Sequence, residues 1–262
     1  MTPYAALATF GLVAAAVAGL VVGSFLNVVA HRLPRGESVA FPGSRCPSCG
    51  APIAPYDNVP VVSWIFLGGR CRACRAKIAL RYPALELSNA LLWVGAFRVA
   101  PTWWDFATGA FLCSAGLALL AIDAEFQILP DLVTLPGIAI GLLLSIGSVR
   151  RTPLSALIGA SLGAGGLFLL AFLYEKIAGQ EGMGLGDVKM LGMIGALLGP
   201  AGVLVTVLAA SLSGSVVGIA LMIARGADGK MRLPFGVFLA IGAIGAWFFG
   251  DPLITRYRAL WP

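Results

Sequence analysis

Charged side chains are scarce in this sequence. Only 11% of its 262 residues are Asp, Glu, Lys or Arg, whereas 59% are hydrophobic, and the mean hydropathy is +0.92. A soluble globule of this size cannot bury such a composition when the apolar residues lie in long unbroken runs. The scarcity of charge therefore excludes a soluble enzyme, a disordered chain and a small scaffold held by disulfides.

Histidine is nearly absent as well, since His31 is the only one. A hydrolase with a Ser–His or Cys–His pair would have to depend on His31, and no nucleophile elbow accompanies it. The net charge of +6 comes without a sequence module that stacks bases or reads a groove, so nucleic acid is not an expected partner. The remaining candidates for a functional site are therefore the cysteines and the few acidic residues.

Apolar runs dominate what is present. All but one, 188–199, are long enough to cross a hydrocarbon core of about 30 Å as a helix. Inside lipid, backbone groups find partners only in helices or closed barrels, and these runs lack the alternation of barrel strands. We therefore predict an all-α polytopic membrane protein with about eight transmembrane helices. The eight apolar segments are 5–29, 84–100, 106–122, 131–148, 153–173, 188–199, 201–224 and 234–250.

One polar block, residues 30–83, separates the first two apolar segments and carries much of the positive charge. Because Lys and Arg are enriched in cytoplasmic loops, we expect this block inside the cell, with the lipid bilayer as a partner. This topology places Arg150 and Arg151 outside the cell, contrary to the usual enrichment of basic residues in cytoplasmic loops. The predicted organisation is a first transmembrane helix at 1–29, a cytoplasmic domain at 30–83 and a transmembrane domain at 84–262.

Four of the five cysteines lie in the polar block, as Cys46-x-x-Cys49 and, after 21 intervening residues, Cys71-x-x-Cys74. Two such pairs at this separation are typical of a zinc ribbon, in which two tight turns supply four thiolates to one tetrahedral ion. Two disulfides are the alternative, but the cytoplasm keeps thiols reduced. We predict a structural zinc in a zinc-ribbon-like insertion, because four sulfur ligands leave no open coordination position.

Two aspartates stand out among the acids. Asp123 follows an apolar run at the end of one predicted helix, and Asp187 leads into another. The predicted topology places both at the cytoplasmic edge of the membrane. Two carboxyl groups that meet in such a poorly solvated place share a proton, so one can act as a base on water while the other donates to a carbonyl oxygen. The pair therefore indicates an aspartic protease.

Each aspartate also has a simpler interpretation, as a helix cap or as the partner of a basic side chain such as Lys189. Gly184 and Gly186 precede Asp187, and glycines there let the backbone approach a bound peptide closely. Glu125 is expected either to orient a catalytic acid or to face the lipid headgroups.

Three further acids have ordinary expected roles. Asp131 follows Pro130 and is predicted to cap the next helix. Asp105 and Asp251 fall in predicted external loops, where we expect ordinary solvated charges.

Taken together, these motifs resemble the bacterial type IV prepilin leader peptidases, also called prepilin peptidase/N-methyltransferases. The resemblance spans nearly the whole chain, and so many ordered motifs at compatible spacing are far more specific than any one of them. The motifs are Gly23-Ser24-Phe25-Leu26-Asn27-Val28, Arg32-Leu33-Pro34, Gly36-Glu37, Ser44-Arg45-Cys46-Pro47-Ser48-Cys49, Tyr56-Asp57-Asn58-Val59-Pro60, Arg81-Tyr82-Pro83 with Glu86, Asp123-x-Glu125, Leu129-Pro130-Asp131, Thr134-Leu135-Pro136 and Gly184-x-Gly186-Asp187-Val188-Lys189.

The resemblance implies an aspartic endopeptidase of the bacterial inner membrane, with Asp123 and Asp187 as a catalytic pair that faces the cytoplasm. Its substrates would be type IV prepilins or type II secretion pseudopilins, cut after a glycine in the leader. Bifunctional members then methylate the new N-terminal residue with S-adenosylmethionine, an activity associated with the polar block, which here holds Glu37 and the four cysteines. The supporting residues expected around the catalytic pair are Gly184, Gly186, Glu125 and Lys189.

Two other functions remain open from the residues alone. A non-catalytic membrane scaffold would dock a partner through the zinc ribbon and would need neither aspartate. A transporter would carry protons on acids deep within its helices, whereas Asp123 and Asp187 lie at a predicted membrane edge. The edge placement therefore favours chemistry over translocation.

Overall fold

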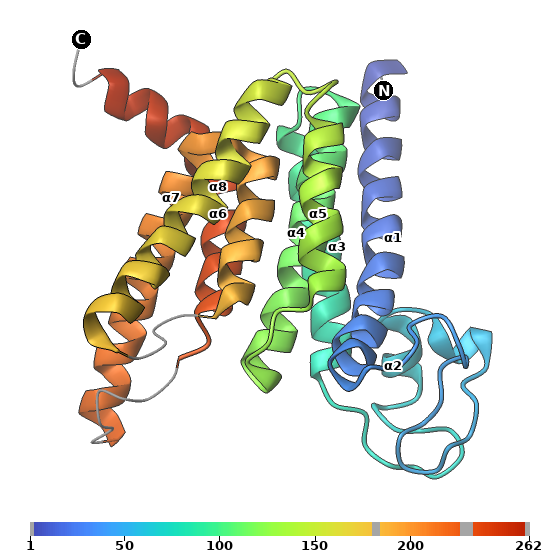
Figure 1. Ribbon diagram of the computed structural model, residues 1–262. Coiled ribbons are helices and arrows are strands. Elements are labelled where there is room, and N and C mark those ends of the chain that lie inside the picture. Colours follow the sequence, from blue (N-terminus) through green and yellow to red (C-terminus); the bar gives the residue numbers. More distant parts are fainter. Residues whose placement is uncertain (1–2, 180–183, 226–232, 260–262) are drawn as a thin grey trace. The chain divides into compact units, whose positions relative to one another are not determined.

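The computed structural model describes residues 3–179, 184–225 and 233–259, and outside the polar block these residues are mostly helical (Figure 1). Two short 3₁₀ helices, η1 (Leu33–Arg35) and η2 (Pro55–Asn58), lie in the polar block. The α-helices of the described part are α1 (Pro3–Arg32), α2 (Val62–Phe66), α3 (Arg81–Val99), α4 (Trp103–Phe126), α5 (Asp131–Leu144), α6 (Pro153–Ala178), α7 (Leu185–Arg225) and α8 (Phe235–Ala259).

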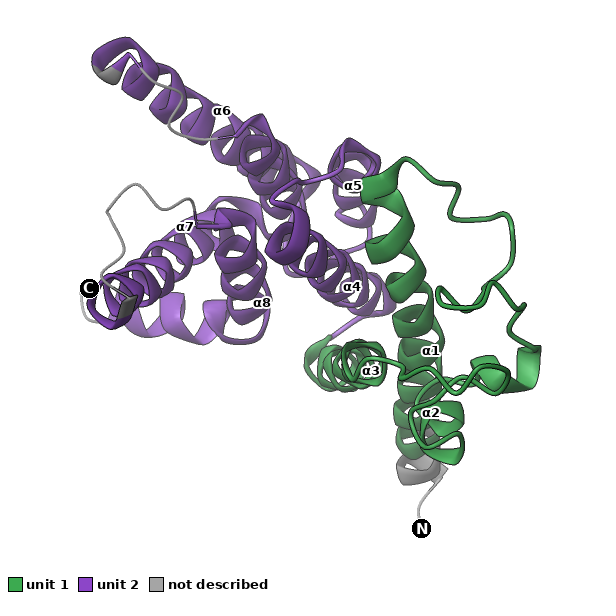
Figure 2. Ribbon diagram, turned by 90° about the horizontal axis from the view of Figure 1, so that it is seen from below, with its two compact units in different colours: residues 1–100 green, residues 101–262 purple. Residues whose placement is uncertain are grey.

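Two compact units make up the chain, unit 1 at residues 1–100 and unit 2 at residues 101–262 (Figure 2). Unit 1 holds α1, α2, α3 and the polar block, and unit 2 holds α4 to α8. The predicted domain boundary at residue 84 lies within α3, and the two compact units divide after Ala100.

Unit 1 is held together by the close approach of α1 and α3. The backbone of α3 at Glu86 and Ala90 lies so near Gly23 and Gly19 that a Cβ on either glycine would clash. The buried Asn89 side chain donates a hydrogen bond to the Gly19 carbonyl oxygen at 2.7 Å. Small residues at helix interfaces allow such backbone contact in membrane proteins. The pairing of α3 with α1 therefore depends on glycine at these two positions.

A hydrogen bond between distant residues positions the short helix α2. Glu86 is only 8% exposed, and its Oε2 accepts a hydrogen bond from the Val61 N–H at 2.7 Å. Val61 has a φ of 61°, a positive value that β-branched residues rarely adopt. The buried carboxylate thus holds the turn that leads into α2.

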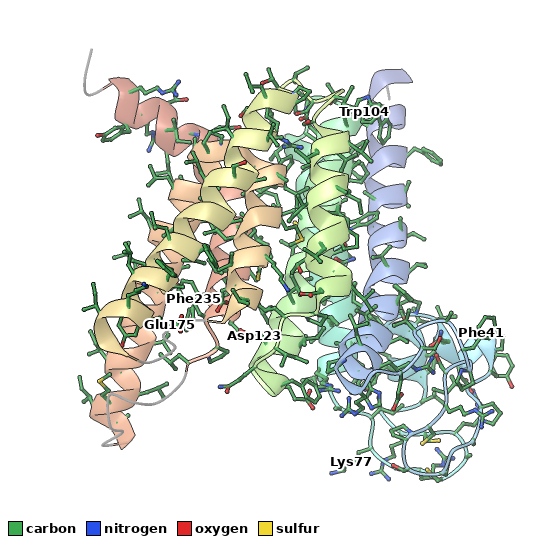
Figure 3. The ribbon with its side chains drawn as sticks, viewed as in Figure 1. Phe41, Lys77, Trp104, Asp123, Glu175 and Phe235 are labelled. Carbon is green, nitrogen blue, oxygen red and sulfur yellow. The ribbon has the colours of Figure 1, made fainter. Side chains whose placement is uncertain are left out.

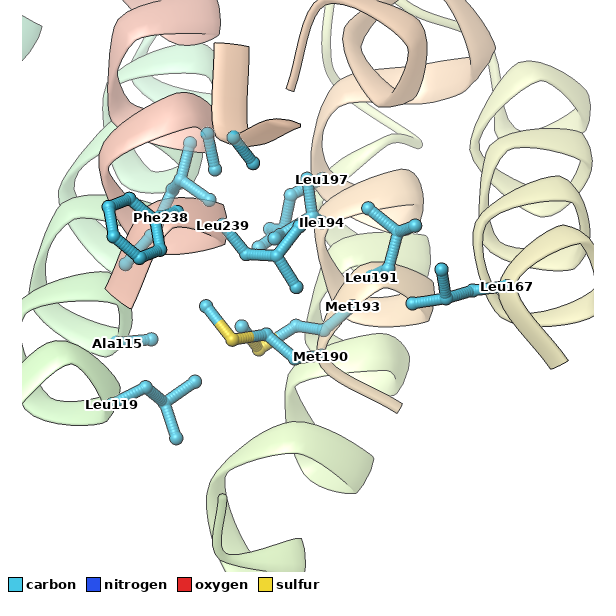
Figure 4. Packing of buried hydrophobic residues seen from close by; sticks show 14 of the residues in the cluster. Ala115, Leu119, Leu167, Met190, Leu191, Met193, Ile194, Leu197, Phe238 and Leu239 are labelled. Carbon is cyan, nitrogen blue, oxygen red and sulfur yellow. The ribbon is translucent and has the colours of Figure 1, made fainter. Parts of the chain in front are cut away.

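Unit 2 packs its helices around one apolar core (Figure 4). Leu119 of α4, Ile194 of α7 and Leu239 of α8 are completely buried in it, and Leu167 contributes from α6. The core therefore joins helices that are far apart in the sequence, and it fixes the ends of α4, α7 and α8 relative to one another.

The helix α7 contains a break at Gly199, which has a φ of 72° and is followed by Pro200. Before the break, successive residues of α7 meet successive residues of α5, so these helices run parallel. After the break, the order of contacts with α8 is reversed. The contacts are Met193 with Gly137 and Ala196 with Gly141 before the break, and Thr206 with Gly242 and Gly214 with Phe238 after it.

The break is a reversal of direction. Both α5 and α8 begin at the end of unit 2 that carries Asp123, so α7 runs away from that end and then returns to it. The division that the sequence predicts between segments 188–199 and 201–224 coincides with this reversal. Glycine suits the position because it adopts a positive φ without a steric penalty.

Five helices in the described part of the chain are long and apolar enough to cross a membrane, namely α1, α4, α6, α7 and α8. The apolar helix α5 is shorter, and α3 carries Glu86, Asn89 and Arg98 among its apolar residues. The structure therefore supports an all-helical, multi-pass membrane protein, with five candidate spans where the sequence predicts about eight transmembrane helices.

Asp105 lies in the first turn of α4 and is completely buried. Its carboxylate accepts hydrogen bonds from the Thr102 hydroxyl at 2.6 Å, from the Ser148 hydroxyl and from the Val149 N–H. The prediction that Asp105 is an ordinary solvated charge is therefore wrong. Figure 3 shows the neighbouring Trp104 at the end of α4 opposite to Asp123.

Arg150 and Arg151, which run against the positive-inside rule, belong to the same end of unit 2. Arg151 is 6% exposed, donates to the Thr108 hydroxyl at 2.6 Å and is attracted by the negative charge of Asp105. Arg150 lies 3.8 Å from the carboxylate of Asp251. Interactions within the protein account for both arginines, so their position is compatible with the predicted topology.

Replacing Asp105 by alanine should destabilise the protein by about 3 kcal/mol, because buried donors and the nearby Arg151 lose their charged partner. Replacing Asp251, whose side chain is 71% exposed, should cost less than about 1 kcal/mol. Thermal unfolding of the purified protein in one detergent measures both effects. Equal unfolding midpoints for Asp105→Ala and Asp251→Ala would contradict the buried role of Asp105.

Candidate active site and metal centre

Asp123 lies in the last turn of α4 and is only 5% exposed. Its Oδ2 accepts a hydrogen bond at 3.1 Å from the backbone N–H of Val237, in the first turn of α8. The first N–H groups of a helix have no partner within the helix, and they form the positive end of its dipole. The start of α8 therefore supplies both a donor and a favourable field to a carboxylate 114 residues away in the sequence.

Gly236, next to Val237, has no room for a side chain. A Cβ at this position would lie 2.9 Å from Asp123 Oδ2 and 2.9 Å from Leu129 Cδ2. Glycine here lets the start of α8 approach the carboxylate. Sequence reasoning missed both residues, and the only available signal was a Pro-Phe-Gly run at 234–236, at the start of the apolar segment 234–250.

Asp187 lies in the first turn of α7 and is half-buried. Its backbone N–H donates to the Gly184 carbonyl oxygen at 3.1 Å. A Cβ on Gly186 would lie 3.0 Å from the Cβ of Leu129, in the connection between α4 and α5. Leu129 thus packs against both Gly186 and Gly236, which brings the segments of the two aspartates together.

The two aspartates meet at one end of unit 2, where α4 ends and where α7 and α8 begin. Leu129 touches Gly186, the neighbour of Asp187, and also Gly236, where a Cβ would lie 2.9 Å from Asp123 Oδ2, so the segments of both aspartates converge here. Figure 3 shows Asp123 at the same end as Phe235, the first residue of α8. Two carboxyl groups that come together in a poorly solvated place can share a proton. The pair can therefore take a proton from water and give one to a carbonyl oxygen.

Lys189 forms an ion pair with Asp131. Its Nζ lies 2.8 Å from both carboxylate oxygens of Asp131, in the first turn of α5. This bidentate ion pair replaces the alternative in which Lys189 is the partner of Asp187. The predicted capping role of Asp131 is wrong, because Pro130 occupies the N-cap position. The ion pair instead ties the start of α5 to the start of α7.

The two glutamates that the sequence singles out, Glu125 and Glu37, are both exposed. Because Glu125 is exposed at the end of α4, we favour the interpretation that it faces the lipid headgroups over the interpretation that it orients a catalytic acid. Glu37 follows η1, where its backbone N–H donates to the Arg32 carbonyl oxygen at 3.1 Å. Glu37 is not among the residues that line two clefts of about 330 Å³ each in the described part of unit 1.

The four cysteines of unit 1 converge on one point. The Sγ atoms of Cys46, Cys49, Cys71 and Cys74 all lie within 4.8 Å of one another, and those of Cys46 and Cys74 are 3.8 Å apart. Sulfur ligands about 2.3 Å from a zinc ion lie about 3.8 Å apart at the corners of a tetrahedron. Both the donor set and the spacing therefore suit a thiolate-bound metal. All four are free cysteines, so the structure does not support the two-disulfide alternative.

Two matching turns build this cluster. The Gly50 N–H donates to the Cys46 carbonyl oxygen at 2.8 Å, and the Arg75 N–H donates to the Cys71 carbonyl oxygen at 3.0 Å. The residue after each second cysteine has a positive φ, 70° at Gly50 and 61° at Arg75. Glycine adopts this conformation freely, whereas arginine is strained there. The second turn is therefore the weaker of the two.

The backbone prepares the cluster for a cation. The N–H groups of Cys49 and Ser48 point at the Cys46 sulfur and lower the pKa of Cys46 from 9.0 to about 6. The N–H of Ala51 acts in the same direction on Cys49, but the thiol of Cys74, burial and the Cys46 sulfur outweigh it and raise the pKa of Cys49 to about 11. Deprotonation of one thiol therefore makes deprotonation of its neighbours harder. Because a metal ion binds thiolates, metal binding should release the protons that the remaining thiols hold.

Replacing Arg75 by glycine should tighten metal binding by about 1 kcal/mol, because the left-handed conformation then carries no side-chain strain. Gly50→Ala should weaken binding by a similar amount. The chelator concentration that removes half of the zinc from the purified, reduced protein measures both changes. Weaker zinc binding by the Arg75→Gly variant would contradict backbone strain at Arg75. Wild-type protein that retains no metal would refute the proposed metal centre.

Two family models match this chain. The bacterial peptidase A24 N-terminal domain matches residues 17–99, within unit 1. The type IV leader peptidase family matches residues 110–219, within unit 2, a range that includes both aspartates.

Several curated proteins are similar over nearly the full length. One from Pseudomonas aeruginosa is 36% identical over 267 residues, covering 91% of this chain and 90% of its own. One from Burkholderia pseudomallei is 39% identical over 284 residues, covering 96% and 90%. One from Neisseria gonorrhoeae is 37% identical over 251 residues, covering 86% and 87%. Each is named prepilin leader peptidase/N-methyltransferase.

No solved structure gives a significant match. The family models and the similar proteins agree with the family that the ordered sequence motifs indicate.

Proposed function

This chain belongs to the type IV leader peptidase family, and on that premise we propose that it cleaves the leader from type IV prepilins and methylates the new N-terminus. The observation that supports the cleavage activity is the convergence of the segments that carry Asp123 and Asp187, where α4 ends and where α7 and α8 begin. Similarity to prepilin leader peptidase/N-methyltransferases over nearly the full chain supports the second activity.

In the proposed reaction, Asp123 takes a proton from water as the water oxygen attacks the carbonyl carbon of the leader glycine. Asp187 gives its proton to the carbonyl oxygen, which yields a tetrahedral diol. As the C–N bond breaks, Asp123 returns its proton to the leaving amine and Asp187 regains one from a diol hydroxyl. The Val237 N–H stabilises negative charge on Asp123, which favours Asp123 as the base.

We infer an inner-membrane protein whose aspartates face the cytoplasm, since the resemblance and the basic polar block both indicate this orientation. The proposed eight crossings are α1, α3, α4, α5, α6, the two halves of α7, and α8. The mature part of a prepilin or pseudopilin begins with an apolar helix, which can lie in the bilayer beside unit 2. Its cleavage site then reaches the membrane edge, where Asp123 and Asp187 would meet it.

Methylation is proposed to belong to unit 1, with S-adenosylmethionine as the methyl donor. The spacing of the four sulfurs supports zinc as a structural ion there, because a closed set of four thiolates leaves no position for a substrate. Such an ion would hold two turns of an irregular segment that has little regular secondary structure of its own.

Replacing Asp123 or Asp187 by asparagine should lower the cleavage rate by about 10³-fold in each case, because an amide of the same shape can neither take nor give the proton. The measurement is cleavage of a purified prepilin in detergent or lipid, followed by mass spectrometry of the product. Asp251→Asn, at the other end of unit 2, serves as a control and should cleave normally.

Two outcomes would change the proposal. Normal cleavage by either asparagine variant would remove that residue from the catalytic pair. Wild-type protein that leaves prepilin uncut in several lipids would favour the alternative, a non-catalytic membrane scaffold that docks a partner through its metal cluster.

Gly236→Ala should lower kcat by about 10²-fold, because the new methyl group would push the Asp123 carboxylate away from its position. Gly245→Ala is the matched control, since it lies on the same helix and a Cβ there meets nothing within 4 Å. Steady-state kinetics of prepilin cleavage by both variants measure the predicted difference in kcat. Equal kcat values for the two variants would show that close approach of α8 does not position Asp123.

A further inference from the structure

We propose that S-adenosylmethionine binds in a cleft of unit 1 that η2, α2 and the second cysteine turn form, an inference that rests on the proposed methylation. The cleft has a volume of about 330 Å³. Its lining includes Tyr56 and Asp57 of η2, Ser63 and Phe66 of α2, and Arg72, which lies between the third and fourth cysteines. This volume is at the lower end of the range of small-molecule sites.

The chemistry of the lining matches the chemistry of the ligand. S-adenosylmethionine carries two cations, a sulfonium and an ammonium, together with a carboxylate, ribose hydroxyls and an adenine ring. Such a molecule needs a negative acceptor, a donor for its carboxylate and an aromatic face for its ring or its sulfonium. The cleft offers Asp57, Arg72 and the rings of Tyr56 and Phe66.

The charged pair in the cleft keeps the capacity to bind a ligand. Arg72 donates through Nε and NH2 to the two carboxylate oxygens of Asp57, at 2.7 and 2.6 Å. These hydrogen bonds hold the pKa of Asp57 below its usual value, so the carboxylate stays charged at neutral pH. A carboxylate oxygen accepts more than one hydrogen bond and a guanidinium has five N–H donors. Both side chains therefore have sites left for the ligand.

The cleft is also held in shape before any ligand arrives. The Ser63 hydroxyl donates to the Tyr56 carbonyl oxygen at 2.9 Å and accepts from the Val59 N–H at 3.1 Å. Just before α2, the strained backbone of Val61 is fixed by its hydrogen bond to Glu86. Backbone strain persists only where the surroundings hold it, and it is frequent at ligand sites.

A second cleft of unit 1 fits the ligand less well. It also measures about 330 Å³, and its lining includes Val21, Phe25 and Arg32 of α1 together with Asn58. Its lining residues include no acid, so it offers no charged partner for the sulfonium or the ammonium group. The cation of Arg32 would oppose a ligand with two positive groups.

The position of Arg72 links the cleft to the metal centre. It lies between Cys71 and Cys74, so the turn that a metal ion would hold is the turn that presents the guanidinium. Removal of the metal should therefore weaken binding of S-adenosylmethionine even though the metal does not touch it.

Calorimetric titration of the full-length protein in detergent tests the site, with S-adenosylmethionine and its stable product S-adenosylhomocysteine as probes. Asp57→Asn and Phe66→Ala should each raise Kd by about tenfold or more, through loss of the charge and of the aromatic face. Phe66 is 86% exposed, so its truncation should not disturb folding. The matched control is Phe41→Ala, which is 80% exposed in the same unit, lies outside both clefts and should bind normally (Figure 3).

Photo-crosslinking of radiolabelled S-adenosylmethionine locates the site directly. Label in a peptide that covers residues 54–72 supports the proposal, whereas label confined to residues 21–44, which include Glu37 and much of the second cleft, overturns it. Metal content equal to that of the wild type shows that each variant is folded.

The possible failures can be told apart. If the wild type cleaves prepilin but binds neither probe and leaves the product unmethylated, the proposed methylation fails. If the wild type binds and both cleft variants bind equally well, only the location fails.

Discussion

A carboxylate inside an apolar helical protein is stable only where hydrogen-bond donors replace the water that it has lost. The structure meets this requirement in both units with a backbone N–H group from a distant segment, so each buried acid joins two parts of the chain. Three acids of the sequence thus link distant parts of the chain as well as carrying charge. The three pairs are Glu86 with Val61, Asp105 with Val149, and Asp123 with Val237.

The hydrogen bond between Val237 and Asp123 determines how the candidate active site is built. It attaches the start of α8 to the end of α4, and it leaves Asp187 to be brought in from α7 against the repulsion of a second charge. Packing of Leu129 on Gly186 supplies part of the opposing force. The ion pair that anchors the start of α7 to the start of α5 supplies another part. Repulsion between the carboxylates is what makes the pair useful, because it keeps a proton available for transfer.

Patterns of residue type and spacing predict the helices, the cysteine cluster and the division of segments at 199–201, because each leaves a recognisable motif in the sequence. Long-range polar partners leave no such pattern. The Val237 donor to Asp123, the Ser148 donor to Asp105 and the acid that binds Lys189 lie 114, 43 and 58 residues away, with no periodicity that points to them. The strained turn at Arg75 is hidden for another reason, since its partner turn uses the expected glycine and arginine gives no local sign of a positive φ.

The chemistry of the two proposed activities also sets their order. The amino group that accepts the methyl group is a free amine only after the peptide bond has broken, because an amide nitrogen is not nucleophilic. The aspartates belong to unit 2 and the proposed cleft to unit 1, and the chain passes between the units once, after Ala100. The new N-terminus must therefore transfer from one unit to the other while its apolar helix remains in the bilayer. Confinement to the membrane raises its effective concentration at the second site, as a tether does, so methylation can follow cleavage without tight binding of the product.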